Sequence, residues 1–270
     1  MPVDVEARVI RNTRLSSDYN VIALAAPDIA SAVAPGQFVM IKSHHGHDPL
    51  LRRPFSVFEI LRTNGRVDGL TLLSKRVGVT TSMLFDAVEG DVVSCLGPLG
   101  CAFETVRPPT EAWMVAGGVG LAPFATLSEA LRAQGASTTL FYGARSSREL
   151  FYLEWFRARG VRLVLSTEDG STGDRGRVTL PLERELQRAG DTDITVYACG
   201  PHAMLKAVAT LSATHGRPSQ VSVERVMGCG LGGCYSCVVP LRDGHAGHHY
   251  IRSCIGGPVF PGSEIVWDLT

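Results

Sequence analysis

Residues 1–107 alternate hydrophobic and polar positions in short runs, a pattern typical of half-buried β-strands. Turn sequences such as Ala34-Pro35-Gly36 and Thr63-Asn64-Gly65 separate the runs, and one short helix is expected at residues 80–85. Short strands at this regular spacing predict an antiparallel β-barrel. The predicted strands are residues 5–15, 20–26, 37–42, 55–61, 70–75 and 91–96.

The pattern changes after Pro108-Pro109, which is typical of a linker. Strand-like runs then alternate strictly with helical runs, and this alternation predicts a doubly wound α/β domain around a parallel sheet. Residues 223–270 are rich in glycine and poor in helix signals. The chain is therefore predicted to be multidomain α+β, with a barrel at 1–107, an α/β domain at 108–222 and a small C-terminal domain at 223–270. In the second domain, strands are predicted at 112–116, 138–142, 161–166 and 194–199, and helices at 122–133, 150–159, 180–189 and 201–214.

The composition narrows the class of protein without identifying it. The chain has 270 residues, of which 45% are hydrophobic and 19% charged, values that fit two or three globular domains. Its formal net charge is zero, so neither nucleic acid nor an anionic membrane is favoured as a partner. No run approaches the roughly 20 apolar residues of a membrane span, and the first twenty residues lack the apolar core of a signal peptide. We therefore expect a cytoplasmic protein.

Four of the seven cysteines have the spacing of metal ligands. They follow the pattern C-x4-C-x2-C, then sixteen residues, then C, which is the ligand pattern of a plant-type [2Fe–2S] cluster. Three of the four residues between the first two are glycine, which lets the backbone approach the cluster. A four-cysteine zinc site is the main alternative, although zinc sites more often use two closely spaced pairs; four unrelated buried thiols are the other. The candidate ligands are Cys229, Cys234, Cys237 and Cys254.

Three cysteines remain, and so small and odd a number does not indicate a disulfide framework. They are Cys95, Cys101 and Cys199. A cluster held by thiolates also suits a reducing compartment. Cysteine usage therefore supports the expected cytoplasmic location.

Two stretches of the barrel contain residues suited to a flavin nucleotide. The segment Arg53-Pro54-Phe55-Ser56 offers an arginine fork for phosphate, an aromatic face and a hydroxyl. The segment from Leu72-Leu73-Ser74 to Thr80-Thr81 ends a strand and opens a helix, whose N-terminal N–H groups could bind phosphate. Each has a plainer explanation: ordinary strand residues with a surface arginine, and a helix N-cap by Thr80 or Thr81.

Two glycine-containing turns of the α/β domain suit a nicotinamide dinucleotide. Gly117-Gly118-Val119-Gly120 joins a strand to a helix, where glycine lets a pyrophosphate approach the helix N-terminus, although the G-x-G-x-x-G fingerprint is absent. Cys199-Gly200-Pro201 ends a later strand, and ligands of such sheets lie at strand carboxyl ends. Close packing explains the first turn as well, and Cys199 could be a small buried hydrophobe. Arg145-Ser146-Ser147-Arg148 could meet the ribose, which leaves NAD and NADP both open.

These motifs occur in the order found in the ferredoxin–NADP reductase superfamily, which the chain resembles. Its C-terminal region resembles, more narrowly, the electron-transfer subunit of heterodimeric NAD-dependent dihydroorotate dehydrogenase. The segments that carry this second resemblance are Glu224-Arg225-Val226-Met227-Gly228-Cys229-Gly230-Leu231-Gly232-Gly233-Cys234, Cys254-Ile255-Gly256-Gly257-Pro258-Val259-Phe260, Thr167-Glu168-Asp169-Gly170-Ser171 and Gly176-Arg177-Val178-Thr179.

The resemblance implies a role for each motif. Ser74 stands where the family usually has an aromatic residue, and Thr80 where it often has glycine. Ser56 and Cys199 would border the path of the hydride. FAD would be held by Arg53, Pro54, Phe55, Ser56, Leu72, Leu73 and Ser74, with Thr80 and Thr81 at its diphosphate; NAD(P) would be held by Gly117, Gly118, Val119, Gly120, Cys199, Gly200 and Pro201.

The same resemblance implies a function in pyrimidine biosynthesis. The chain would pass electrons between an FMN-containing dihydroorotate dehydrogenase catalytic subunit, in a heterotetramer, and NAD+. Because a hydride carries two electrons and a [2Fe–2S] cluster accepts one, FAD between them would divide the pair. Two alternatives stay open: an NAD(P)H-dependent reductase serving another acceptor such as an oxygenase or hydrogenase, and a non-enzymatic nucleotide-binding module stabilised by zinc.

The histidines gather in two stretches, residues 44–47 and 245–249. They are expected to be solvated loop residues rather than metal ligands, because surface loops tolerate such variation.

Overall fold

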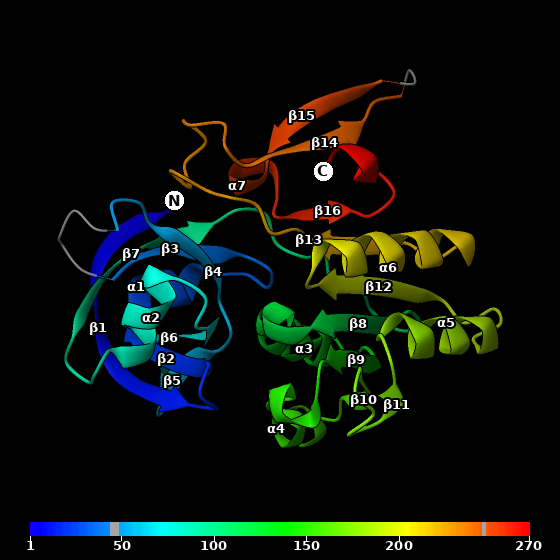
Figure 1. The fold of residues 1–270 in the computed structure, drawn as a ribbon, viewed down its shortest axis with the longest axis horizontal. Coiled ribbons are helices and arrows are strands. Elements are labelled where there is room, and N and C mark those ends of the chain that lie inside the picture. Colours follow the sequence, from blue (N-terminus) through cyan, green and yellow to red (C-terminus); the bar gives the residue numbers. More distant parts are fainter. Residues whose placement is uncertain (44–48, 245–246) are drawn as a thin grey trace.

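The computed structural model describes residues 1–43, 49–244 and 247–270. Its N-terminal part is an antiparallel sheet that curls around two short helices, α1 (Pro27–Ala32) and α2 (Val79–Asp86) (Figure 1). The strand order is β4-β3-β7-β1-β2-β6-β5. The strands are β1 (Val3–Arg14), β2 (Tyr19–Ala25), β3 (Phe38–Lys42), β4 (Arg53–Ser56), β5 (Ile60–Thr63), β6 (Arg66–Lys75) and β7 (Val92–Leu99).

The described strands form an open half-barrel with β4 and β5 at its edges, so the closed barrel that the strand spacing suggests is wrong. Most of its elements agree with the sequence prediction, but the single strand predicted at 55–61 is also wrong. The chain there leaves β4 at one edge of the sheet and enters β5 at the other edge. Val57 and Phe58 are buried consecutively, so the alternation that defines a strand breaks between them. The Phe58 N–H donates to the Thr71 carbonyl at 2.8 Å and holds this crossing on β6. Helix α2 confirms the prediction at 80–85, whereas α1 was not predicted.

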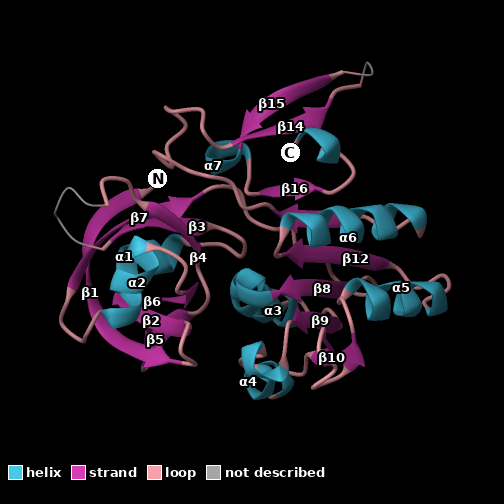
Figure 2. Ribbon diagram, viewed as in Figure 1, coloured by secondary structure: helices cyan, strands magenta, loops and turns pink. Residues whose placement is uncertain are grey.

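The α/β unit is a mainly parallel sheet in the order β11-β10-β9-β8-β12-β13-β16, with helices on both faces (Figure 2). This confirms the predicted doubly wound arrangement. The strands are β8 (Glu111–Gly117), β9 (Thr138–Ala144), β10 (Arg162–Thr167), β11 (Asp174–Arg175), β12 (Ile194–Cys199) and β13 (Ser219–Ser222), and the helices are α3 (Ala122–Ala133), α4 (Leu153–Arg157), α5 (Thr179–Arg188) and α6 (His202–Thr214).

The helix predicted at 150–159 is shorter in the structure, where α4 covers only five residues. Tyr152, just before it, has a left-handed backbone with φ of 60°. Its ring packs edge-on against Phe58 of the half-barrel, with centroids 4.6 Å apart. An interdomain aromatic contact thus takes the place of the first helical turn.

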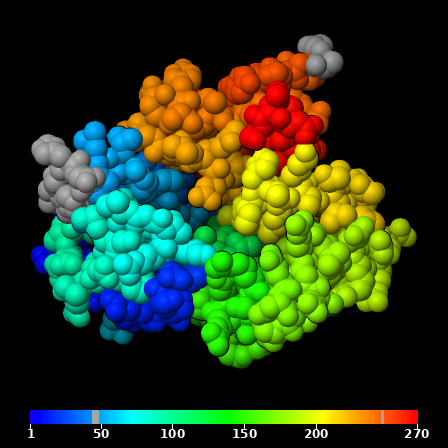
Figure 3. Space-filling view, in the orientation of Figure 1, coloured from blue at the N-terminus to red at the C-terminus, as the bar shows by residue number. Residues whose placement is uncertain are grey.

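The C-terminal segment touches both of the preceding units. Its hairpin of β14 (Val238–Arg242) and β15 (His248–Arg252) leads into the short helix α7 (Ser253–Gly256). Strand β16 (Val259–Pro261) then pairs antiparallel with β13 and forms the last strand of the α/β sheet. Figure 3 shows the segment seated over both the half-barrel and α6. Within the described residues, no helix is long and apolar enough to cross a membrane.

Candidate redox site

The hairpin β14–β15 brings together the cysteines that the sequence spaces apart. Cys229 and Cys234 lie in the loop after β13, Cys237 directly precedes β14, and Cys254 lies in α7. Because Val238 pairs with Arg252, the start of β14 lies beside the end of β15. The Ser253 N–H donates to the Cys237 carbonyl at 2.9 Å and fixes the two chain segments there.

The sulfurs form two pairs, and polar groups of the loop surround them. The N–H groups of Leu231 and Gly233 donate to Cys229 Sγ at 3.4 and 3.3 Å. A hydrogen bond with the Ser236 hydroxyl, followed by the nearness of Cys229, lowers the pKa of Cys234 to about 6. Burial, followed by the nearness of Cys237, raises the pKa of Cys254. Cys234 is thus prepared for the thiolate form, whereas Cys237 and Cys254 are buried.

Two glycines shape this loop, and each has a positive φ, +73° at Gly230 and +81° at Gly232. A Cβ at Gly230 would lie 2.7 Å from Met40 Cγ, and one at Gly232 only 2.1 Å from Ile255 Cδ1. The loop therefore needs glycine at both positions for space as well as for conformation.

Two pairs of cysteines around a glycine loop fit a [2Fe–2S] cluster, in which two irons share four thiolates. The described residues contain no group of three His, Cys, Asp or Glu side chains placed to hold one metal ion.

The cluster loop packs directly on the half-barrel. One hydrophobic cluster joins Cys237 and Cys254 to the side chains of β3 and β7. Met40 of β3, which contacts Gly230, is the cross-strand partner of Pro54 in β4. A single strand thus separates the cluster loop from the predicted flavin motif. The members of this cluster are Phe38, Met40, Leu96, Leu99, Met227, Cys237 and Cys254.

Strand β4 places the residues of the predicted flavin motif on its two faces. Phe55 is buried in the half-barrel core, and Ser56 is partly exposed. Among the described residues, the exposed Arg53 donates to the carbonyls of Leu51 and Arg52, at 3.0 and 3.1 Å. Its guanidinium therefore keeps donors for a phosphate.

Strand β6 and helix α2 hold the second flavin stretch. Leu72 points into the half-barrel core, whereas Leu73 joins the core shared with the α/β unit. The buried Oγ of Ser74 has no hydrogen-bond partner among the described residues, which leaves a hydroxyl for a polar ligand atom. Thr80 is buried, and Thr81 accepts the N–H groups of Val77 and Gly78, each at 2.9 Å. The predicted N-cap at Thr80 or Thr81 is wrong, because Gly78 is the N-cap and Thr81, at the third helical position, bonds back to it.

The two predicted nicotinamide turns are in direct contact at the carboxyl edge of β8 and β12. A Cβ at Gly120 would lie 2.1 Å from the Cys199 carbonyl oxygen, and one at Gly200 would lie 3.0 Å from the Gly117 nitrogen. At Gly118, by contrast, φ is +56° and an added Cβ would meet nothing within 4 Å. The buried side of the turn is thus closed by backbone, while its outer face is open to a ligand, a fit to a dinucleotide.

Cys199 is partly exposed at this edge, and Pro201 follows it at the start of α6. Burial raises the pKa of the Cys199 thiol to about 12. A hydrogen bond with Ser222 lowers this pKa, whereas the carboxylate of Glu224 raises it further. The thiol is therefore neutral near pH 7. Sequence reasoning missed Ser222 and Glu224. Ser222 is the cross-strand partner of Cys199, so a parallel pairing of β12 with β13 would have been the signal.

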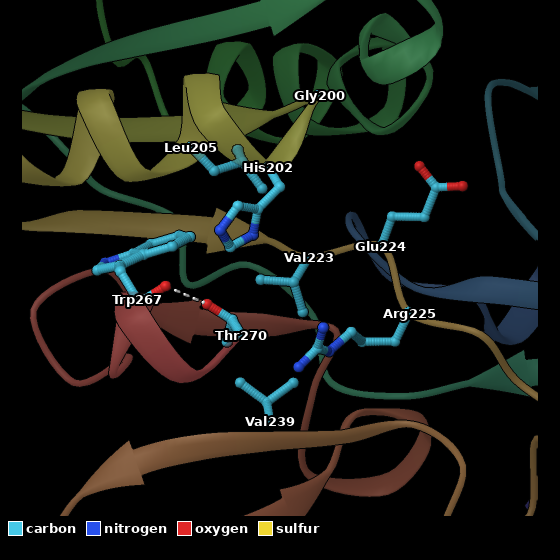
Figure 4. Close-up of a pocket in the computed structure, with 9 residues that line it drawn as sticks. All are labelled: Gly200, His202, Leu205, Val223, Glu224, Arg225, Val239, Trp267 and Thr270. Carbon is cyan, nitrogen blue, oxygen red and sulfur yellow. Dashed lines mark hydrogen bonds between the residues drawn. The ribbon is translucent and has the colours of Figure 1, made fainter.

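A cavity of about 140 Å³ continues from this edge towards the C-terminal segment (Figure 4). His202 at the start of α6 and Trp267 near the C-terminus pack against each other at its wall, with ring centroids 5.4 Å apart. The carboxyl edge of the sheet thus extends to the unit that contains the cysteines. The lining residues are Gly200, His202, Leu205, Val223, Glu224, Arg225, Val239, Trp267 and Thr270.

Comparisons with known proteins agree with this geometry. Residues 224–266 match the iron–sulfur cluster binding domain of dihydroorotate dehydrogenase B, and residues 114–210 match an oxidoreductase NAD-binding domain. A protein of Desulforamulus reducens named dihydroorotate dehydrogenase B (NAD(+)), electron transfer subunit, is 36% identical over 97% of this chain and 98% of its own length. The chain belongs to this family. A Geobacillus kaustophilus member is 38% identical over 86% of each chain.

Solved structures place the dihydroorotate dehydrogenase B electron transfer subunit family among flavin-dependent reductases. An NADH-dependent reduced ferredoxin–NADP oxidoreductase superposes with a TM-score of 0.84 at 28% identity, over 98% of this chain and 91% of its own. The ferredoxin reductase of carbazole 1,9a-dioxygenase shares the fold, with a TM-score of 0.67 at 23% identity over 80% of this chain and 67% of its own. The chain is therefore an oxidoreductase subunit with an NAD-binding and an iron–sulfur domain, which removes the non-enzymatic zinc module.

The loop predicted to meet the ribose, residues 145–148, contacts the segment at residues 167–171 that carries part of the family resemblance. The Ser147 N–H donates to Ser171 Oγ at 2.8 Å. Arg145 is paired with Glu149, so this loop does not present Arg145 as a free arginine for a 2′-phosphate. His248 and His249 are exposed on β15, as expected, whereas residues 44–47 and His245 lie outside the described residues.

Proposed function

We propose that this chain passes electrons between an FMN-containing dihydroorotate dehydrogenase catalytic subunit and NAD+, in pyrimidine biosynthesis. The proposal assigns FAD to residues 1–107, NAD(P) to residues 108–222 and the [2Fe–2S] cluster to residues 223–270. A heterotetramer with the catalytic subunit, in the cytoplasm, completes it. Both the subunit composition and the location are predictions.

One observation carries the proposal: the predicted flavin strands lie between the two other sites. On one side, Pro54 of β4 is the cross-strand neighbour of Met40, on which the cluster loop packs. On the other side, Leu73 of β6 shares a core with Leu121, which follows the nicotinamide turn. Directly opposed residues on neighbouring strands are about 5 Å apart, so the route from the cluster loop to the flavin motif crosses a single strand.

The chain's own residues position and shield rather than react. When bound, FAD exchanges two electrons with the nicotinamide and single electrons with the cluster. Arg53 and the N-terminus of α2 would bind the FAD phosphates, and Gly118 would face the dinucleotide pyrophosphate. The neutral thiol of Cys199 and the hydroxyl of Ser56 would border the nicotinamide without transferring a proton. Cys229, Cys234, Cys237 and Cys254 would hold the cluster.

Reconstitution tests the proposal. Purified anaerobically, the chain should reduce ferricyanide with NADH but should not oxidise dihydroorotate. When it is mixed with the FMN-containing subunit of the same organism, dihydroorotate-dependent reduction of NAD+ should appear. If the two subunits form a stable complex that does not couple dihydroorotate oxidation to NAD+ reduction, the proposal is contradicted.

A second candidate function is a reductase for a different acceptor. The likeness to an NADH-dependent reduced ferredoxin–NADP oxidoreductase favours it, because that protein spans nearly the whole chain. The same preparation separates the two candidates. NADH-dependent reduction of ferredoxin, together with no coupling to dihydroorotate, would support the second.

A further inference from the structure

Arg252 connects the end of β15 to the cluster loop. It is half-buried and lies two residues before Cys254. Its Nη1 donates to the Gly232 carbonyl at 2.6 Å. The same guanidinium stacks on the Tyr235 ring, 4.6 Å from its centroid. One side chain thus contacts the loop on both sides of Cys234.

The Gly232 carbonyl belongs to the same peptide group as the Gly233 N–H. That N–H donates to Cys229 Sγ at 3.3 Å. The guanidinium, the peptide group and the sulfur therefore form a continuous chain of hydrogen bonds. A cation at the carbonyl end polarises the peptide group and strengthens the donor at the sulfur end.

The surroundings hold this peptide group in place. Gly232 has φ of +81°, and the Ile255 side chain closes the space where its Cβ would be, at 2.1 Å. Tyr235 has φ of +58°, an unusual conformation for a residue with a side chain. Arg252 stacks on the ring of this residue. Ser236, the next residue, accepts the Gly228 N–H at 3.1 Å and lies 3.1 Å from Cys234 Sγ.

From this geometry we infer that Arg252 is a positioning residue that raises the reduction potential of the cluster through the Gly232–Gly233 peptide. Reduction adds negative charge at the cysteine sulfurs, and a polarised N–H donor together with a nearby cation stabilises the reduced form. Hydrogen bonds to cluster sulfurs are among the terms that set such potentials. The inference rests on the proposed cluster at the four cysteines and adds a residue that determines its potential.

The experiment compares Arg252→Gln with Arg252→Lys and Arg242→Gln in the full chain. Arg242→Gln removes the same charge from the other end of the hairpin, where Arg242 pairs with His248. Four residues of strand, about 13 Å, separate the two arginines. The readout is the midpoint potential of the cluster, from anaerobic titration followed by paramagnetic resonance.

Arg252→Gln should lower the midpoint potential of the cluster by about 59 mV, which for one electron is a tenfold shift of the equilibrium towards the oxidised form. Arg242→Gln should leave it unchanged. Arg252→Lys keeps the charge but lacks the planar fork, so it should show a smaller shift in the same direction.

An Arg252→Gln chain that binds the cluster and keeps the wild-type midpoint potential would overturn the inference. If that variant does not bind the cluster, Arg252→Lys decides: a lowered potential supports the inference, and an unchanged one overturns it. Absence of the paramagnetic signal in the wild-type chain would instead contradict the proposed function. The two failures are thus distinguishable.

Discussion

Gly120 is the position where the structure separates two explanations of a sequence motif. The sequence allows either the approach of a pyrophosphate or close packing as the reason for the glycines of this turn. At Gly120 the structure favours close packing, because the carbonyl oxygen and carbon of Cys199 would lie 2.1 and 2.5 Å from an added Cβ. Backbone cannot move aside as a flexible side chain can, so Gly120→Ala must separate the two nicotinamide turns.

The expected cost lies at the upper end of overpacking, about 3 kcal/mol in the free energy of unfolding. At roughly 2–4 °C per kcal/mol, the melting temperature of the α/β unit should fall by about 6–12 °C. Because both turns border the dinucleotide, the KM for NADH should also rise, roughly tenfold if about 1.4 kcal/mol of binding is lost.

Gly118→Ala is the matched control within the same turn. Its Cβ would meet nothing within 4 Å, so only the strain of φ at +56° remains, about 1 kcal/mol. It should therefore melt within a few degrees of wild type while it hinders NADH, since its open face is where a pyrophosphate would approach. The assays are thermal unfolding and NADH–ferricyanide reductase activity. Wild-type melting and an unchanged KM in Gly120→Ala would refute the packing argument.

Three further outcomes follow from the site. Cys229→Ser should abolish the paramagnetic signal of the cluster and the coupling to a partner. The rate of ferricyanide reduction by NADH should stay within about twofold of the wild-type rate, because the nicotinamide and flavin motifs lie in other units. Loss of both activities would contradict this separation. Since burial raises the pKa of Cys199 to about 12, its thiol stays neutral between pH 6 and 9. The pH profile of NADH oxidation by Cys199→Ala should therefore keep the wild-type shape, and a lost inflection would show that Cys199 titrates. Thr81→Ala should lower the free energy of unfolding by about 1 kcal/mol, because two N–H groups lose their acceptor. Ser82→Ala removes one exposed side-chain hydrogen bond, and this variant should have the wild-type melting temperature in calorimetry.

Local patterns predicted most elements of the fold because at least one face of each is buried. The alternation in β1 and the helical run of α6 correspond to observed elements with one buried face, whereas β6 and α3 are buried on both faces and were recognised from their apolar runs. The errors fall where a tertiary contact overrides the pattern. Phe58 is buried as the chain crosses the half-barrel, and Tyr152 leaves the helical conformation to pack against it. Neither partner can be inferred from the sequence around the other.

The candidate site shows the same division. Spacing alone indicated the four cysteines, because the ligands of a cluster are close in sequence. Ser222 was missed because its contact with Cys199 depends on which strands pair in a parallel sheet. Arg252 was missed for a similar reason: its bond to Gly232 spans twenty residues and exists only once the hairpin forms. Residues that act through a neighbour leave no local signal.

The half-barrel contacts the two sites through separate hydrophobic clusters. The nicotinamide turn meets it through the core that contains Leu73, whereas the cluster loop meets it through the cluster around Met40, and these two clusters share no residue. The α/β and C-terminal units also pack on each other, since β16 pairs with β13 and Val239 joins the core of the α/β sheet. A substitution that disturbs only one contact with the half-barrel should therefore affect one site more than the other. For this reason a glycine in the α/β unit and a cysteine in the C-terminal unit are expected to affect different half-reactions.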